Sequence, residues 1–113
     1  MRAWQEAKSF AVLSRHAINQ LPSSERYALG DQWRRAAYSV VLNIAEGCSR
    51  RGPREFRRYL DIARSSLHEL EAILELAEGL DCVGEAEMRL LRLKRLHCAR
   101  LVYALLRRID EAS

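Results

Sequence analysis

The sequence predicts an all-α protein, an antiparallel up-down-up-down four-helix bundle that forms a single domain over residues 1–113. Apolar residues recur with the helical period in every long segment, and no segment alternates polar and apolar residues as a strand does. Prolines and glycines gather at three breaks, near residues 21–24, 49–53 and 79–84, which separate four segments. Helices of roughly 18 to 27 residues joined by short connections pack antiparallel with their neighbours.

The first two helices are predicted from one apolar stripe each. The first runs from about Ala3 to Gln20, and its stripe is Trp4, Ala7, Phe10, Ala11, Ser14, Ala17, Ile18 and Leu21. The second begins at Ser23 or Ser24, whose hydroxyls can accept hydrogen bonds from the free amides of a first turn. Its stripe is Tyr27, Trp33, Ala37, Val40 and Ile44. Gly30 within it is either a weak point or a position of close approach, since glycine costs about 1 kcal/mol relative to alanine in a helix.

The third and fourth helices carry the clearest patterns. The third begins at Pro53, which suits a first turn because it lacks an N–H. Its heptad seam is Phe56, Leu60, Ala63, Leu67, Leu70, Leu74 and Ala77. The fourth, from about Glu85 to Glu111, has a core stripe of Met88, Leu91, Cys98, Val102, Leu105 and Ile109, with Leu90, Leu93, Leu101 and Leu106 as further apolar surface beside it. We expect this second stripe to be an oligomer interface, the alternative being that the helix lies deepest in the monomer.

The composition excludes several classes of protein. No apolar stretch approaches the roughly 20 residues that cross a bilayer, and the first residues lack the apolar core of a signal peptide, so we expect a cytoplasmic protein without membrane contact. Three widely spaced cysteines, Cys48, Cys82 and Cys98, predict neither a disulfide framework nor a zinc site. We expect no metal and no cofactor. A net charge of +4 permits a polyanionic partner without requiring one.

A basic cluster is the main candidate site. Between residues 50 and 64 there are six arginines and two acids, which give a net charge of +4, equal to that of the whole chain. The arginines are Arg50, Arg51, Arg54, Arg57, Arg58 and Arg64. Arginine's planar fork suits phosphate oxygens, and a helix N-terminus adds amide donors. The cluster therefore predicts contact with the nucleic-acid backbone, without recognition of the bases. The alternative is that these arginines are simply solvated, in a chain that is rich in arginine throughout.

A second set of residues lies in the run from Arg34 to Gly47, where small residues would allow another helix to approach closely. Asn43 and Glu46 are near neighbours on one helix face, and a polar pair beside an apolar stripe is expensive to bury without partners. We favour a structural role for Arg35, Asn43, Glu46 and Gly47, in which Glu46 pairs with Arg35 or with an arginine of the third helix and Asn43 bonds to the backbone. A place in a functional site is the alternative.

Enzymatic hypotheses find little support, and we expect no enzyme. Glutamates do not stand three residues before His16, His68 or His97, so the pattern of a di-metal bundle is absent. Arg92 and His97 have the spacing used by one class of small helical ribonucleases, but those enzymes usually place a polar residue after the arginine, where this chain has Leu93.

Residues 21–80 resemble the 23S rRNA-intervening-sequence proteins, a family also called four helix bundle proteins. The resemblance rests on Leu21-Pro22, Glu25-Arg26-Tyr27, Gln32, Arg34-Arg35-Ala36-Ala37, Ser39, Asn43-Ile44-Ala45-Glu46-Gly47, Arg50, Glu55-Phe56, Tyr59-Leu60, Ile62-Ala63, Ser65-Ser66-Leu67 and Glu69-Leu70-Glu71. Members often have proline and serine where this chain has Val41 and Leu42, so a kink in the second helix is not implied here.

The resemblance implies a homopentameric ring of four-helix bundles. Similar bundles act as accessory variability determinants beside reverse transcriptases in diversity-generating retroelements, where a basic surface is thought to engage nucleic acid. The partners implied are therefore further copies of the chain, RNA or DNA, and a reverse transcriptase. Three hypotheses follow: a nucleic-acid-binding oligomer, a purely structural or protein-interaction scaffold, and, with least support, a ribonuclease that uses Arg92 and His97.

Overall fold

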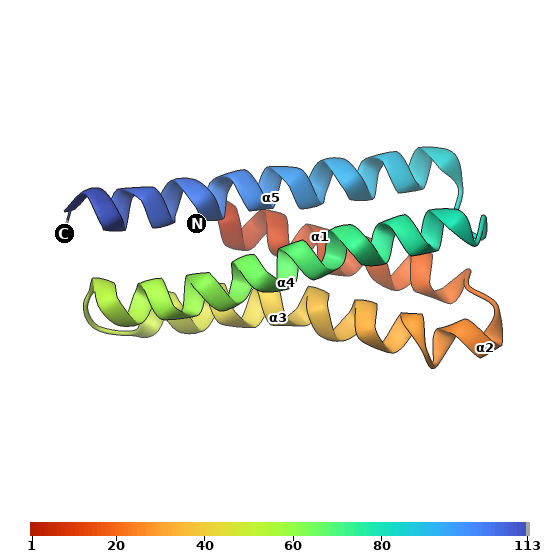
Figure 1. Ribbon diagram of the computed structural model, residues 1–113, viewed down its shortest axis with the longest axis horizontal. Coiled ribbons are helices and arrows are strands. Elements are labelled where there is room, and N and C mark those ends of the chain that lie inside the picture. The colour runs from red at the N-terminus through yellow and green to blue at the C-terminus, as the bar shows by residue number, and fades with distance from the viewer. Residues whose placement is uncertain (113) are drawn as a thin grey trace.

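The computed structural model describes residues 1–112 and is helical almost throughout (Figure 1). Its helices are α1 (Arg2–Asn19), α2 (Ser23–Arg26), α3 (Leu29–Ser49), α4 (Pro53–Gly79) and α5 (Glu85–Ala112). No strand occurs within residues 1–112. The prediction of an all-α fold is confirmed. None of these helices is both long enough and apolar enough to cross a membrane.

The four long helices form one elongated bundle of 46 × 23 × 19 Å. Each packs against two others: α1 against α3, α3 against α4, α4 against α5, and α5 back against α1. Successive helices run in opposite directions along the bundle (Figure 1). The predicted up-down-up-down four-helix bundle is therefore confirmed, and it places the connection between α3 and α4 at the same end as the C-terminus of α5.

The core consists of the stripes that the helical period predicts. In α4 the seam residues Leu60, Ala63, Leu67, Leu70, Leu74 and Ala77 are buried, and Phe56 at its start is half-buried. Trp33 of α3 and Phe10 of α1 are the largest fully buried side chains. The indole N–H of Trp33 donates a hydrogen bond of 2.9 Å to the Ser14 hydroxyl, so the polar atoms of this α1–α3 contact are paired.

The start of the second predicted helix differs from the prediction. Helical structure breaks at Tyr27 and Ala28, so that a short α2 precedes α3. Tyr27, expected in the core stripe, is 80% exposed. Neither serine caps α2, because the amides of Glu25 and Arg26 bond instead to the carbonyl of Pro22.

Gly30 explains the position of this break. It is buried, and a Cβ added there would lie 3.1 Å from Cγ2 of Ile18 on α1. The first turn of α3 thus lies close against α1 at Gly30. Of the two interpretations offered for Gly30, the close approach is the correct one.

The apolar stripe of α5 also differs near its C-terminal end. Met88, Leu91, Cys98 and Val102 are buried as predicted, but Leu106 continues this stripe, and Leu105 and Ile109 are only half-buried. Leu106 lies four residues after Val102 and therefore on the same helix face. Its assignment to an oligomer interface is wrong, since only 3% of its surface is exposed within the monomer.

Candidate nucleic-acid interface

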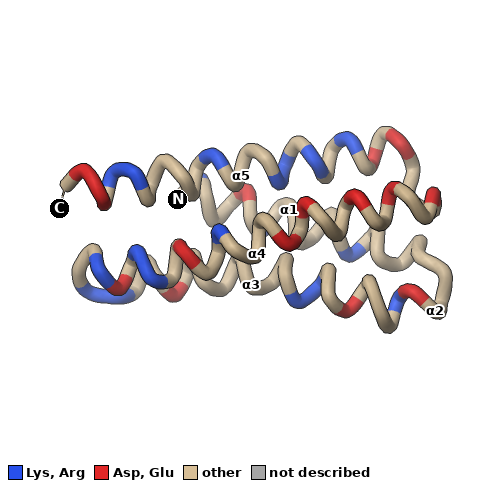
Figure 2. The backbone as a smooth tube through the Cα atoms, in the orientation of Figure 1, with Lys and Arg blue, Asp and Glu red and all other residues tan. Residues whose placement is uncertain are grey.

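Five of the six predicted arginines lie together at one end of the bundle. Arg50 and Arg51 stand in the α3–α4 connection, and Arg54, Arg57 and Arg58 lie on the first two turns of α4. Figure 2 shows basic residues gathered at the end where α3 turns into α4. We call these five arginines the basic end.

Some arginines of the basic end are held by acidic side chains. Arg50 pairs with Glu46 at 2.9 Å, and Arg58 with Glu55 at 3.3 Å. All four of these side chains are 45–56% exposed, so such pairs contribute little to stability. The hydrogen bond and charge of Glu55 raise the pKa of Arg58 further above its ordinary value, which keeps this guanidinium charged.

Two arginines of the basic end, Arg51 and Arg54, have no ion-pair partner within residues 1–112. Both side chains are exposed. They flank the start of α4, where Gly52 adopts a positive φ of 83° and Pro53 begins the helix without a side-chain cap. The amides of an uncapped first turn are free to bind an anion. Two arginines without ion-pair partners therefore stand within two residues of the start of α4.

The C-terminal turns of α5 join the basic end. Arg57 of α4 forms an ion pair with Asp110 of α5, which fixes the two helices to each other there. Arg107 and Arg108 precede Asp110 on α5, and Arg108 has no ion-pair partner within residues 1–112. The sequence pattern did not indicate these two arginines, although the antiparallel topology places the last turns of the fourth helix beside the first turns of the third.

Tyr59 organises the arginines and was likewise not predicted. The guanidinium carbons of Arg50 and Arg58 lie 5.4 and 4.5 Å from the centre of its ring. These distances are within the range of cation–π attraction. The tyrosine ring thus holds one arginine of the connection and one of α4 on the same surface.

Arg64 lies apart from the other five arginines. It is six residues beyond Arg58, the nearest of them, about 9 Å along α4. There it lines a groove between α4 and α5 with His68, Arg95 and Tyr103. The structure therefore divides the predicted cluster into the basic end and a separate position on the side of the bundle.

The predicted structural motif is only partly brought together. Asn43 donates hydrogen bonds of 2.8 and 3.1 Å to the carbonyl and hydroxyl oxygens of Ser39, so the expected backbone bond is present. The Ser66 hydroxyl of α4 donates to the same Ser39 hydroxyl at 2.8 Å. These contacts form a polar link between α3 and α4.

Glu46 pairs neither with Arg35 nor with an arginine of α4, contrary to both pairings that were expected. Glu46 pairs with Arg50 one turn later, which is in the connection and not on the following helix. Arg35 is exposed beside a shallow groove between α3 and α4. Eleven residues separate Arg35 from Glu46, about 16 Å along a helix, which is too far for a direct pair.

Gly47 is a position of close approach between α3 and α4. A Cβ at Gly47 would lie 2.9 Å from Cδ1 of Phe56 and 3.1 Å from Cβ of Tyr59. The glycine therefore allows the tight connection that brings Tyr59 and its arginines next to the end of α3.

The candidate ribonuclease pair is not brought together. Arg92 pairs with Glu75 and Glu78 of α4, at 3.1 and 2.9 Å. His97 instead faces Glu6 of α1, with 3.4 Å between the ring nitrogen and the carboxylate. The two side chains thus turn toward different neighbours of α5.

The remaining residues proposed for an oligomer interface lie on α5. Leu90 and Leu93 are 41% and 62% exposed, whereas Leu101 is half-buried against the core. On α4, Leu76 is 60% exposed. The exposed apolar surface of α5 therefore includes Leu90, Leu93 and Leu96, and Tyr103 is exposed two turns further along the helix.

Comparison with known proteins agrees with this fold. Residues 1–104 match the sequence profile of a family described as 23S rRNA-intervening sequence protein. The chain belongs to this family. A crystal structure of a protein of unknown function from the S23 ribosomal protein family of Bacteroides thetaiotaomicron is similar over 92% of this chain and 97% of that chain, with a TM-score of 0.84 and 19% identity. No curated protein matches the sequence.

Proposed function

We propose that this member of the 23S rRNA-intervening sequence protein family is a non-enzymatic, oligomeric accessory protein that binds the backbone of RNA or DNA through the basic end. The observation that carries the proposal is the pair of exposed arginines, Arg51 and Arg54, without ion-pair partners at an uncapped helix N-terminus. Such a surface offers charge and directed donors to phosphate oxygens. It offers no fixed set of groups for reading base edges, so we expect binding almost independent of sequence.

The arginines that do form ion pairs remain available to a polyanion. Arg50 and Arg58 are paired at exposed positions, where an ion pair contributes about 0–1 kcal/mol. A phosphate can replace such a carboxylate partner at little cost. Tyr59 keeps both guanidinium groups on the same surface during that exchange.

Self-association would multiply the basic end. The exposed Leu93 and Leu90 of α5 give an apolar surface for contact between copies, and the family resemblance favours a pentamer. A ring of copies would present several basic ends to one nucleic acid, which raises the overall affinity by effective concentration. A reverse transcriptase is the protein partner that the resemblance suggests.

The test is fluorescence anisotropy of labelled RNA and DNA, single-stranded and duplex, at 50 and 200 mM salt, a range in which roughly six to ten phosphate contacts lose about 10³–10⁵ in affinity. The variant Arg51→Gln/Arg54→Gln should weaken binding to every sequence and lower the salt dependence by about one unit per lost contact. Arg89→Gln, at the far end of the bundle and 74% exposed, is the control and should bind as the wild type does.

Three outcomes would overturn this proposal. If neither RNA nor DNA binds at 50 mM salt, the structural or protein-interaction scaffold is favoured. The exposed leucines of α5 would then be the surface that contacts other proteins. Cleavage of the labelled RNA that His97→Ala abolishes would favour the ribonuclease. Binding that Arg51→Gln/Arg54→Gln leaves unchanged would show that the surface lies elsewhere.

A further inference from the structure

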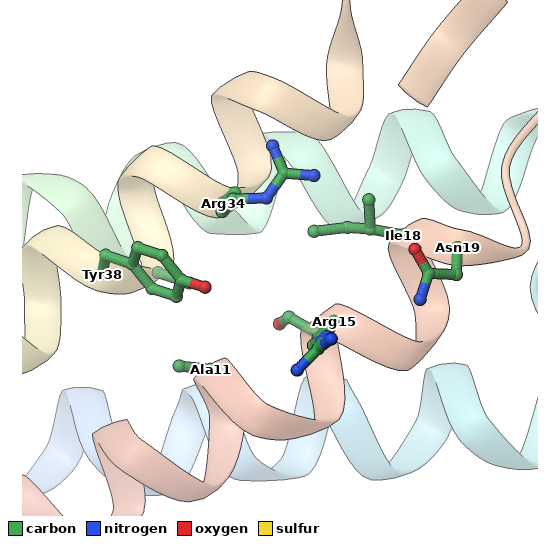
Figure 3. A pocket seen from close by; sticks show the side chains of 8 residues that line it. Ala11, Arg15, Ile18, Asn19, Arg34 and Tyr38 are labelled. Atoms are coloured by element: carbon green, nitrogen blue, oxygen red, sulfur yellow. The ribbon is translucent and has the colours of Figure 1, made fainter. Parts of the chain in front are cut away.

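A small pocket between α1 and α3 is lined by cationic and neutral hydrogen-bonding groups. Its polar side chains are Arg15 and Asn19 of α1 and Arg34 and Tyr38 of α3. Figure 3 shows these side chains around one space, with the hydroxyl of Tyr38 directed into it. Arg34 lies sixteen residues before Arg50 on α3, about 24 Å along the helix, so the pocket is separate from the basic end.

The floor of the pocket is rigid. Ser14, Ile18 and Ala37 form it and are at most 2% exposed, and Ser14 is fixed by the hydrogen bond from the Trp33 indole. The small side chains of Ala11 and Ala37 leave the space open. The four polar side chains are thus positioned by a packed helix contact, and not by a loop.

The polar groups of the pocket lack partners. Within residues 1–112 the side chains of Arg15, Asn19 and Tyr38 make no hydrogen bond and no ion pair. Arg34 uses one nitrogen, Nη1, for Asp31 at 2.7 Å, and its other donors are left free. None of the acidic residues within 1–112 lines the pocket. Of their carboxylates, only that of Asp31 forms an ion pair with a lining residue, Arg34. Two cations therefore face a space that contains no counter-charge.

We propose that this pocket binds a phosphate group, either free phosphate or the terminal group of a small phosphomonoester. Two guanidinium forks, one amide and one phenol can surround a tetrahedral oxyanion, and arginine pairs with phosphate in a bidentate manner. A cavity of about 100 Å³ has room for several water molecules, hence for one phosphate, but not for a nucleotide base as well. An attached organic group would extend into solvent.

The test is isothermal titration calorimetry of the whole chain with inorganic phosphate and, separately, with glycerol phosphate, at ionic strength held constant with sodium chloride. We expect saturable binding with one site per chain. Arg15→Gln and Arg34→Gln should each weaken it at least tenfold, and Arg15→Lys, which keeps the charge but not the fork, should lie between wild type and Arg15→Gln. Tyr38→Phe should weaken it less.

Control variants separate phosphate binding in the pocket from a general effect of charge or of misfolding. Arg89→Gln should bind phosphate as the wild type does, and circular dichroism should show that all variants fold. Absence of saturable binding, or binding that Arg15→Gln and Arg34→Gln leave unchanged, would overturn the proposal. The proposal would also be overturned if the wild type bound no phosphate and Arg15→Gln bound RNA more weakly than the wild type does. The pocket would then bind the phosphodiester backbone of RNA. Failure of the basic end to bind nucleic acid has no bearing on this result.

Discussion

The indole nitrogen of Trp33 on α3 and the hydroxyl of Ser14 on α1 form a buried hydrogen bond of 2.9 Å between two helices of the core. Trp33 is fully buried and Ser14 is 1% exposed, so the bond is shielded from bulk solvent beneath the pocket between α1 and α3. The bond fixes the rotation of α1 against α3, and with it the pocket that lies between these helices.

Replacement of Ser14 tests the importance of this bond. Ser14→Ala leaves the Trp33 N–H buried without an acceptor, which costs about 1–3 kcal/mol. We expect the free energy of unfolding in urea to fall by that amount. Ser65→Ala is the control, since Ser65 is exposed on α4, and should stay within about 0.5 kcal/mol of wild type. Equal stability of the two variants would show that the bond does not matter.

Replacement of Gly47 tests the close contact between α3 and α4. The alanine methyl would lie 2.9 Å from Phe56 and 3.1 Å from Cβ of Tyr59, so the Phe56 ring or the helices themselves must shift. Overpacking costs about 1–3 kcal/mol, of which the higher helix propensity of alanine recovers about 1. We expect Gly47→Ala to lower the free energy of unfolding by up to about 2 kcal/mol.

Gly79→Ala is the matched control for Gly47→Ala. A Cβ at Gly79 meets nothing within 4 Å, and the residue is the last of helix α4. This variant should be neutral or more stable by up to about 1 kcal/mol in the same urea titration. If Gly47→Ala were also neutral, the α3–α4 contact would be more adaptable than its distances indicate.

The exposed part of α5 predicts a change in assembly. Leu93 is 62% exposed, and a charge at the centre of an apolar contact between copies opposes association. We expect Leu93→Glu to lower the mass measured by light scattering after size exclusion, with helical content unchanged. Val12→Glu, at an equally exposed position on α1, should keep the wild-type mass. Loss of assembly in both variants, or in neither, would contradict an interface on this face of α5.

Those parts of the fold that depend on periodicity could be predicted from the sequence. The seam of α4 from Leu60 to Ala77 is buried as predicted because a heptad repeat places every member on one face. The choice between Leu105 and Leu106 was wrong, since both are apolar and only packing against neighbouring helices decides between them. Tyr27 was misplaced for a similar reason: the break before α3 arises where Gly30 meets Ile18 on another helix.

The candidate sites depend on contacts between helices and were predicted only in part. Arg51 and Arg54 are close in sequence and could be recognised together. The last turns of α5, with Asp110, come next to Arg57 only because α5 ends beside the start of α4. The phosphate pocket needs Arg15 and Arg34 from two helices, and neither residue has a sequence neighbour that indicates its role.

The thiol of Cys98 predicts a dependence of stability on alkaline pH. Burial raises the pKa of Cys98 to about 12 from an ordinary value of 9.0, with a smaller contribution from the charge of Glu6 that Arg95 opposes. Above pH 9 the unfolded chain releases this proton while the folded chain keeps it. The unfolded state therefore binds fewer protons, and the free energy of unfolding falls as the pH rises from about 9 toward 12, by up to about 1.4 kcal/mol per pH unit.

Comparison with Cys98→Ala isolates this effect. Other groups titrate in the same range, but they do so in both proteins, so the difference between the two urea-unfolding curves reports Cys98. Cys98→Ala should lose stability at pH 8 through the small cavity it leaves, and this deficit should shrink as the pH rises, because the variant has no thiol to ionise on unfolding. Cys48→Ala, at an exposed position, should keep the wild-type slope. A constant deficit across pH 8–11 would mean that the Cys98 thiol reaches water in the folded state.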